Sequence, residues 1–279
     1  MKKIISSIAI VAALCACSKM NTVSAPASED EGQVVFKASG LKADVLSKAD
    51  VVTELSTFGV IAEETTTPKQ AWSLASVTKS GEDYNTGKYW PSVDEKFAFY
   101  ASNAAMTYAA AGTTVSPANA GTDVVVAYLP YSASTYKAKN ELVFNHIFAR
   151  IGAIAVNKPE GYDSISDVTL ALSAPVNGTY NIKTSTWSSK GTAAAQSLVV
   201  GANDVYVVPG EYTLSVTYTL TKGEYVETFT KSASVDIQEG KVNTITATAP
   251  AGEATEIVFT VKITPWGEHD INVTLADPS

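Results

Sequence analysis

Few side chains in this sequence could carry out catalysis or bind a metal. The chain has two cysteines, Cys15 and Cys17, and two histidines, His146 and His269. Thiols and imidazoles are the usual nucleophiles, general bases and zinc ligands, but here their spacing matches no such site. No phosphate-binding loop, dinucleotide fingerprint or nucleophile elbow is present either. We therefore expect no enzyme, no cofactor and no metal site.

The chemistry that the cysteines do support lies at the N-terminus. Lys2 and Lys3 precede an apolar run, residues 4–14, which is too short to span a membrane, since a span needs about 20 residues. This layout is typical of a secretory signal peptide. The run ends in Leu14-Cys15-Ala16-Cys17, which resembles the lipobox of bacterial lipoproteins. The resemblance implies removal of residues 1–16 and lipidation of Cys17, for example with palmitate. The alternative is an ordinary signal peptide with a cysteine near its cleavage site.

The part of the chain after the signal has no cysteine other than Cys17, so its core must stabilise it without disulfides. The whole chain has a net charge of −8, and Arg150 is its only arginine. A nucleic acid partner needs clustered basic residues, so this charge argues against one. Residues 17–32 are small, polar and acidic, which predicts a flexible tether.

The remaining sequence predicts β-strands and turns. Apolar and polar residues alternate in run after run, and Asn177-Gly178 and Pro209-Gly210 are typical turn pairs between runs. An Ala-rich stretch, residues 104–111, could form at most a short helix. The expected strands are 34–38, 58–62, 96–100, 124–129, 142–156, 168–172, 198–200, 205–208, 212–220, 226–237, 242–248, 257–263 and 271–275.

Short strands separated by turns predict an all-β fold of two tandem β-sandwich domains. The polar Pro/Gly break at residues 157–161 is the expected boundary, which gives domains 33–160 and 161–279. His146 lies inside an expected strand, so we interpret it as a structural histidine within or at the edge of a sheet. The four tryptophans could form a sugar-stacking platform, but packing at sandwich ends and domain seams is favoured; they are Trp72, Trp90, Trp187 and Trp266.

Several short motifs occur in an order that carries more information than any one of them. The chain resembles the fimbrillin family of Bacteroidetes, the subunits of type V pili, over residues 33–275. The motifs are Ser47-Lys48-Ala49-Asp50, Leu55 to Ala62, Lys88-Tyr89-Trp90-Pro91, Lys96 to Ala101, Leu142 to Ile151, Val168-Thr169-Leu170, Gly178-Thr179-Tyr180-Asn181, Trp187 and Ile263-Thr264-Pro265-Trp266-Gly267.

The resemblance implies a fold, a location and an assembly mechanism. The fold is two tandem transthyretin-like β-sandwiches, and the subunit travels as a lipoprotein to the outer membrane. A trypsin-like protease then cuts the loop after the first strand, and that strand leaves. A C-terminal strand of a neighbouring subunit fills the groove, which is donor-strand exchange. The implied partners are other fimbrial subunits and an unidentified surface receptor, and the implied role is cell adhesion.

The residues of this chain can be placed on that mechanism. Val34 and Phe36 would point inward from the leaving strand, and Lys48-Ala49 would be the processing site. The family often has arginine there, whereas this loop offers only Lys48 or Lys42. The protease must therefore accept lysine, or else the subunit stays uncut. The donor strand would be supplied by residues 258–275, with apolar residues Ile257, Phe259, Val261 and Ile263.

Other functions remain open at this point. An uncut subunit would act as an anchor at the base of the pilus, and a place at the pilus tip is a further option. A monomeric surface lipoprotein that binds glycans through exposed tryptophans is the alternative from another class. Asp163-Ser164-Ile165 resembles the O-glycosylation site of these bacteria at Ser164, although a plain turn accounts for the same residues.

Overall fold

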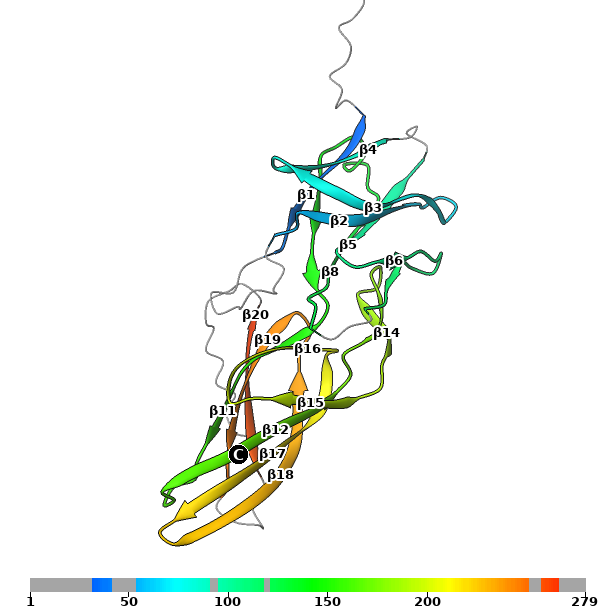
Figure 1. The fold of residues 1–279 in the computed structure, drawn as a ribbon. Helices are drawn as coiled ribbons and strands as arrows, with labels where there is room; N and C mark the ends of the chain where they lie inside the picture. The colour runs from blue at the N-terminus through cyan, green and yellow to red at the C-terminus, as the bar shows by residue number, and fades with distance from the viewer. Residues whose placement is uncertain (1–31, 42–53, 91–94, 118–120, 251–256, 266–279) are drawn as a thin grey trace, which may run out of the picture.

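The computed structural model describes residues 32–41, 54–90, 95–117, 121–250 and 257–265. These residues form twenty strands and no helix, so the prediction of an all-β fold is confirmed. The Ala-rich stretch contains the short strand β6 (Met106–Thr107) in place of a helix. The molecule is elongated, with strands packed in layers towards each end (Figure 1). Among the described residues, none belongs to a helix long and apolar enough to cross a membrane.

The first sandwich is built from one eight-stranded sheet in the order β10-β8-β5-β2-β3-β4-β1-β9. Side chains from both ends of this order meet in one core, so the sheet closes over itself as two layers. The long strand β3 takes part in both layers, because it pairs with β2 along most of its length and with β4 at its end. The strands are β1 (Gln33–Ser39), β2 (Thr57–Glu64), β3 (Lys69–Ser80), β4 (Asp83–Tyr89), β5 (Phe97–Ser102), β8 (Val125–Leu129), β9 (Asn140–Val143) and β10 (Asn145–His146).

The second sandwich consists of two facing four-stranded sheets, β16-β11-β19-β20 and β15-β12-β17-β18. Alternate residues of these strands fill the core between them, for example Leu172, Leu214 and Ile245, which are completely buried. The strands are β11 (Ala149–Asn157), β12 (Ser164–Ala174), β15 (Ala194–Leu198), β16 (Gly201–Val207), β17 (Gly210–Lys222), β18 (Tyr225–Ile237), β19 (Lys241–Thr248) and β20 (Val258–Pro265).

The chain passes from the first sandwich to the second earlier than the sequence predicted. The expected strand 142–156 is divided into β9, β10 and β11, and β11 pairs with β16 and β19 of the second sandwich. The division occurs because Phe144 packs in the first core, whereas Ile147 and Phe148 pack in a separate cluster between the sandwiches. The chain thus crosses between His146 and Ala149, before the expected boundary at residues 157–161.

A small sheet joins the two sandwiches. Its order is β14-β13-β7-β6, so it combines β7 (Thr114–Val115) from the first half of the chain with β13 (Gly178–Asn181) and β14 (Thr186–Lys190) from the second. Beneath it lies an apolar cluster that includes Tyr100, Phe148 and Tyr206. The pairing of these short strands was not predicted, because none of them contains a long alternating apolar run.

Candidate functional site

Strand β1 lies between two other strands of the first sandwich (Figure 1). It is antiparallel to β4, with Phe36 opposite Tyr84, and parallel to β9, with Phe36 opposite Asn140. Val34 and Phe36 are completely buried, and the Phe36 ring meets Phe99 edge-on with ring centroids 5.0 Å apart. β1 therefore supplies side chains to the middle of the core although it is the first strand of the chain.

Hydrogen bonds hold β1 along its length. The Thr86 hydroxyl donates to the Val34 carbonyl at 2.7 Å, and the Trp90 backbone N–H donates to the Gly32 carbonyl at 2.7 Å. At the other end, the Phe144 N–H donates to the Ser39 carbonyl at 2.9 Å. All of these contacts are non-covalent. The peptide chain after Ser39 is therefore what links β1 covalently to the rest of the sandwich.

Removal of β1 would leave a slot with a defined shape. Within the described part of the chain, strand β9 is the last strand of the sheet and pairs with β1 only. Without β1, the facing edges of β4 and β9 would present unpaired backbone groups over an apolar floor that includes Phe99. Such a slot is chemically suited to bind one extended strand with apolar residues at alternate positions.

The connection from β1 to β2 leaves and rejoins the same sandwich. Leu41 packs partly against the first core, and Leu55 is 4% exposed, with its carbonyl accepting a hydrogen bond from the Tyr84 hydroxyl. The expected processing residues Lys48 and Ala49 lie between these two points, outside the described residues. A single break there would disconnect β1 without cutting any described strand.

The predicted donor residues lie on an edge strand of the second sandwich. Among the described strands, β20 is the last of its sheet and pairs only with β19. Ile257 is buried, whereas Phe259, Val261 and Ile263 are only partly buried. The expected strand 271–275 lies outside the described residues. β20 could therefore separate from the sheet by breaking its pairing with one strand.

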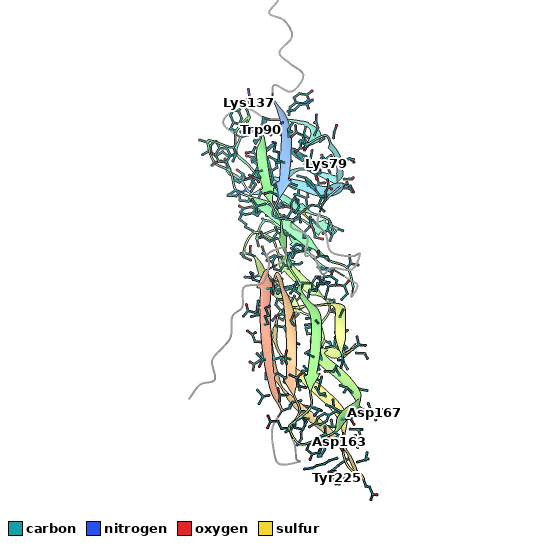
Figure 2. The ribbon with its side chains drawn as sticks, turned by 90° about the vertical axis from the view of Figure 1, so that its left-hand side faces the viewer. Lys79, Trp90, Lys137, Asp163, Asp167 and Tyr225 are labelled. Atoms are coloured by element: carbon teal, nitrogen blue, oxygen red, sulfur yellow. The ribbon has the colours of Figure 1, made fainter. Side chains whose placement is uncertain are left out.

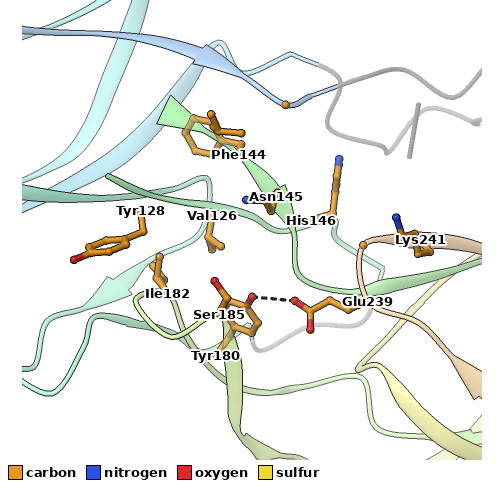
Figure 3. A pocket seen from close by; sticks show the side chains of 13 residues that line it. Val126, Tyr128, Phe144, Asn145, His146, Tyr180, Ile182, Ser185, Glu239 and Lys241 are labelled. Carbon is orange, nitrogen blue, oxygen red and sulfur yellow. Dashed lines mark hydrogen bonds between the residues drawn. The ribbon is translucent and has the colours of Figure 1, made fainter. Parts of the chain in front are cut away.

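A cavity of about 680 Å³ lies between the two sandwiches (Figure 3). His146 lines it from β10, where Nδ1 lies 2.8 Å from Oδ2 of the completely buried Asp123. His146 is thus hydrogen-bonded at a sheet edge, as expected. On the other side, the Tyr180 hydroxyl donates to Glu239 Oε1 at 2.9 Å. No group of three or more His, Cys, Asp or Glu side chains in the described part of the chain could hold a metal ion.

Glu239 should make the stability of the junction depend on pH. Burial raises the pKa of its carboxyl, and the hydrogen bond from Tyr180 and the charge of Lys190 act in the opposite direction. Because the folded pKa is raised, the stability that this group contributes is present below its unfolded pKa of about 4.3. It is lost as pH rises through the folded pKa.

Replacement of Glu239 with glutamine should remove this pH dependence. Between about pH 4 and 7, we expect the free energy of unfolding in urea to fall less for Glu239→Gln than for the unmodified chain. Equal losses in the two proteins would contradict this prediction.

The tryptophans that the structure describes pack against the apolar cores, Trp90 buried and Trp72 and Trp187 partly buried. Trp90 is 7% exposed and meets Phe99 edge-on at 5.5 Å, and Trp72 lies 5.9 Å from the same ring. Trp187 packs on Phe148 between the sandwiches. The packing interpretation is therefore confirmed for these three, and they form no exposed platform for sugars. Trp266 lies outside the described residues.

Two expected modification sites remain predictions. Cys17, the expected lipidation site, lies outside the described residues. Ser164 is exposed at the start of β12, next to Asp163 at the end of the molecule that is far from the first sandwich (Figure 2). The Asp163 carboxylate accepts a hydrogen bond from the Gly223 N–H at 2.6 Å. Ser164 is thus accessible to a modifying enzyme.

Comparison with known proteins identifies a family and related folds. The family model described as fimbrillin-like matches residues 48–266. A fimbrial protein from Bacteroides vulgatus superposes with a TM-score of 0.57 at 14% identity, over 84% of this chain and 99% of its own. A candidate cell adhesion protein from Bacteroides uniformis gives a TM-score of 0.50 at 15% identity, over 85% of this chain and 100% of its own. These low identities establish a shared fold alone. No match is found among curated protein sequences.

Proposed function

The chain belongs to the fimbrillin-like family, and on this premise we propose that it is a structural subunit of a fimbrium that assembles by donor-strand exchange. The observation that carries the proposal is the place of β1. This strand lies between β4 and β9 with Val34 and Phe36 completely buried. It is joined to the rest of the described fold through one connection, which contains Lys48.

The physical driving force is the burial of apolar side chains. Filling the slot with three or four large apolar residues stabilises the first sandwich by roughly 5–10 kcal/mol before the cost of ordering the strand. A subunit that has lost β1 would expose this surface and two unpaired strand edges, which favours association with another strand. The incoming strand would come from the C-terminal part of a second subunit.

The proposal includes the route to the cell surface. Residues 1–16 would direct export, and lipidated Cys17 would hold the subunit at the outer membrane, with residues 18–32 as a tether to two transthyretin-like sandwiches. Cleavage at Lys48 would break the covalent link to this anchor, and the departure of β1 would then release the subunit and open the slot. The assembled fimbrium would contribute to cell adhesion. None of these steps requires a catalytic group of the chain itself.

Limited trypsin digestion of residues 18–279 tests the proposal. We expect one early cut at Lys48, then loss of the preceding segment, and then growth of the protein into ladders. Mass spectrometry identifies the cut, and sizing measures the ladders. The matched variant carries Lys42→Gln together with Lys48→Gln, because trypsin then has no lysine to cut in this loop and the protein should remain a monomer. If the loop resists trypsin and the protein remains a monomer, strand exchange at this site is wrong. An uncut anchor at the pilus base then becomes the better assignment.

A further inference from the structure

The segment that begins β20 repeats the residue pattern of β1. Val34-Val35-Phe36 in β1 corresponds to Ile257-Val258-Phe259, and the next inward position is apolar in both segments, Ala38 and Val261. Phe259 is also the only phenylalanine in the sequence after Phe229. Both segments thus place two apolar side chains, the second of them a phenyl ring, at adjacent positions on the same strand face.

Resting on the proposed function, we propose that β20 of one subunit replaces β1 of the next in the same direction and the same register. Ile257 takes the position of Val34, and Phe259 takes the position of Phe36. The donor strand would then run antiparallel to β4 and parallel to β9, as β1 does.

The floor of the slot explains why a phenyl ring sets the register. Phe99 meets Phe36 edge-on at 5.0 Å and contacts Trp90 and Trp72 as well. A shift of one residue would turn every inward side chain of the donor to the opposite face. A shift of two residues would place Val261 or Ile257 on Phe99 and leave the phenyl ring without its edge-on partners.

The Phe259 ring would be enclosed more completely in the slot than at the sheet edge that it now occupies. The positions of Val34 and Phe36 are completely enclosed, whereas Phe259 and Val261 are only partly buried in β20. Ile257 is already 3% exposed, so its transfer exchanges one buried position for another. The gain therefore comes from Phe259, because Val261 would take the position of Ala38, which is only partly buried.

The two ends of β20 indicate how a released strand would reach a neighbour. Val258 pairs with Thr248 at the end where Ala249 bonds to Asn157, far from the first sandwich (Figure 1). Pro265 pairs with Lys241, which lines the cavity between the sandwiches. A released β20 remains connected to the subunit at its Val258 end, so it extends from the end of the subunit that is far from the first sandwich. Its Pro265 end, in contrast, lies near the middle of the closed subunit. With the acceptor slot in the first sandwich, release of β20 gives a head-to-tail row.

Paired cysteines distinguish the proposed register from the reverse direction. In β1, Val35 lies opposite Asn85 of β4, so the proposal places Val258 opposite Asn85. If the donor ran the other way with Phe259 still in the place of Phe36, Thr260 would lie opposite Asn85. Asn85 and Val258 are both exposed, so cysteines there should not disturb folding.

The experiment mixes an Asn85→Cys subunit, cut at Lys48, with a Val258→Cys or Thr260→Cys subunit under oxidising conditions. Both chains start at Ser18 and so lack native cysteines. We expect the Val258→Cys mixture to give at least about ten times more covalent dimer than the Thr260→Cys mixture, because residues directly opposite lie within disulfide reach and diagonal ones do not. Mass spectrometry of the linked peptides identifies the pair.

The other outcomes separate this proposal from the proposed function. A higher yield with Thr260→Cys overturns the direction. Ladders without cross-linking of either pair mean that the donor is another segment, while assembly by strand exchange stands. Absence of ladders in the unmodified chain after cleavage overturns the proposed function, and the register proposal with it.

Discussion

Replacing Phe36 with alanine should lower the free energy of unfolding of the first sandwich by about 3–5 kcal/mol. The side chain is completely buried and meets Phe99 and the surrounding core, so its removal leaves a cavity in addition to the lost apolar transfer energy. Urea unfolding followed by tryptophan fluorescence measures the change, because Trp72 and Trp90 both lie next to Phe99.

Lys37→Ala is the matched control for Phe36→Ala. Lys37 is the next residue of the same strand and is exposed, so its replacement should change stability by no more than about 0.5 kcal/mol. After cleavage at Lys48, the Phe36→Ala chain should also lose β1 sooner and form ladders sooner than the control. If both variants unfold at the same urea concentration, the side chain of Phe36 does not anchor β1.

Gly40→Ala should be the second strongly destabilising change, by about 3 kcal/mol. Gly40 has φ +84°, a conformation that costs an L-residue about 1–2 kcal/mol. A Cβ atom there would also lie 2.4 Å from the Phe144 carbonyl oxygen. Relief of this overlap must move backbone, and the same residue, Phe144, donates its N–H to Ser39. The end of β1 and its pairing with β9 would both be disturbed.

Gly32→Ala separates the two causes. Gly32 precedes β1 and has φ +99°, but an added Cβ would meet no atom within 4 Å. We expect this variant to lose only the conformational part, about 1 kcal/mol, in the same thermal or urea unfolding measurement. Equal losses for Gly32→Ala and Gly40→Ala would show that the close approach to Phe144 has no energetic consequence.

The sequence by itself was sufficient to predict the class of fold and to predict which face of many strands is buried. Residues 212–220 and 257–263 alternate with a period of two, and both lie in strands, β17 and β20. This works because successive side chains of a strand point to opposite faces, so one buried face appears directly in the order of residues. The burial of His146 follows from the same signal, since it lies inside an apolar run.

Strands with little apolar alternation could not be found in this way. β3 has mostly exposed or partly buried residues, so the run carries no clear buried face, although it connects the two layers of the first sandwich. The four short strands of the joining sheet are stabilised by their partners in the other half of the chain. Their own residues contain no corresponding signal.

Only the tertiary structure decided which strands are neighbours. That β1 lies between β4 and β9, that the chain crosses at residues 147–148, and that β20 begins at the far end are properties of pairings between distant residues. Backbone hydrogen bonds between strands are alike for all residue types, so a local pattern specifies the face of a strand but not its partner. The partner is selected when the apolar faces pack together in a common core.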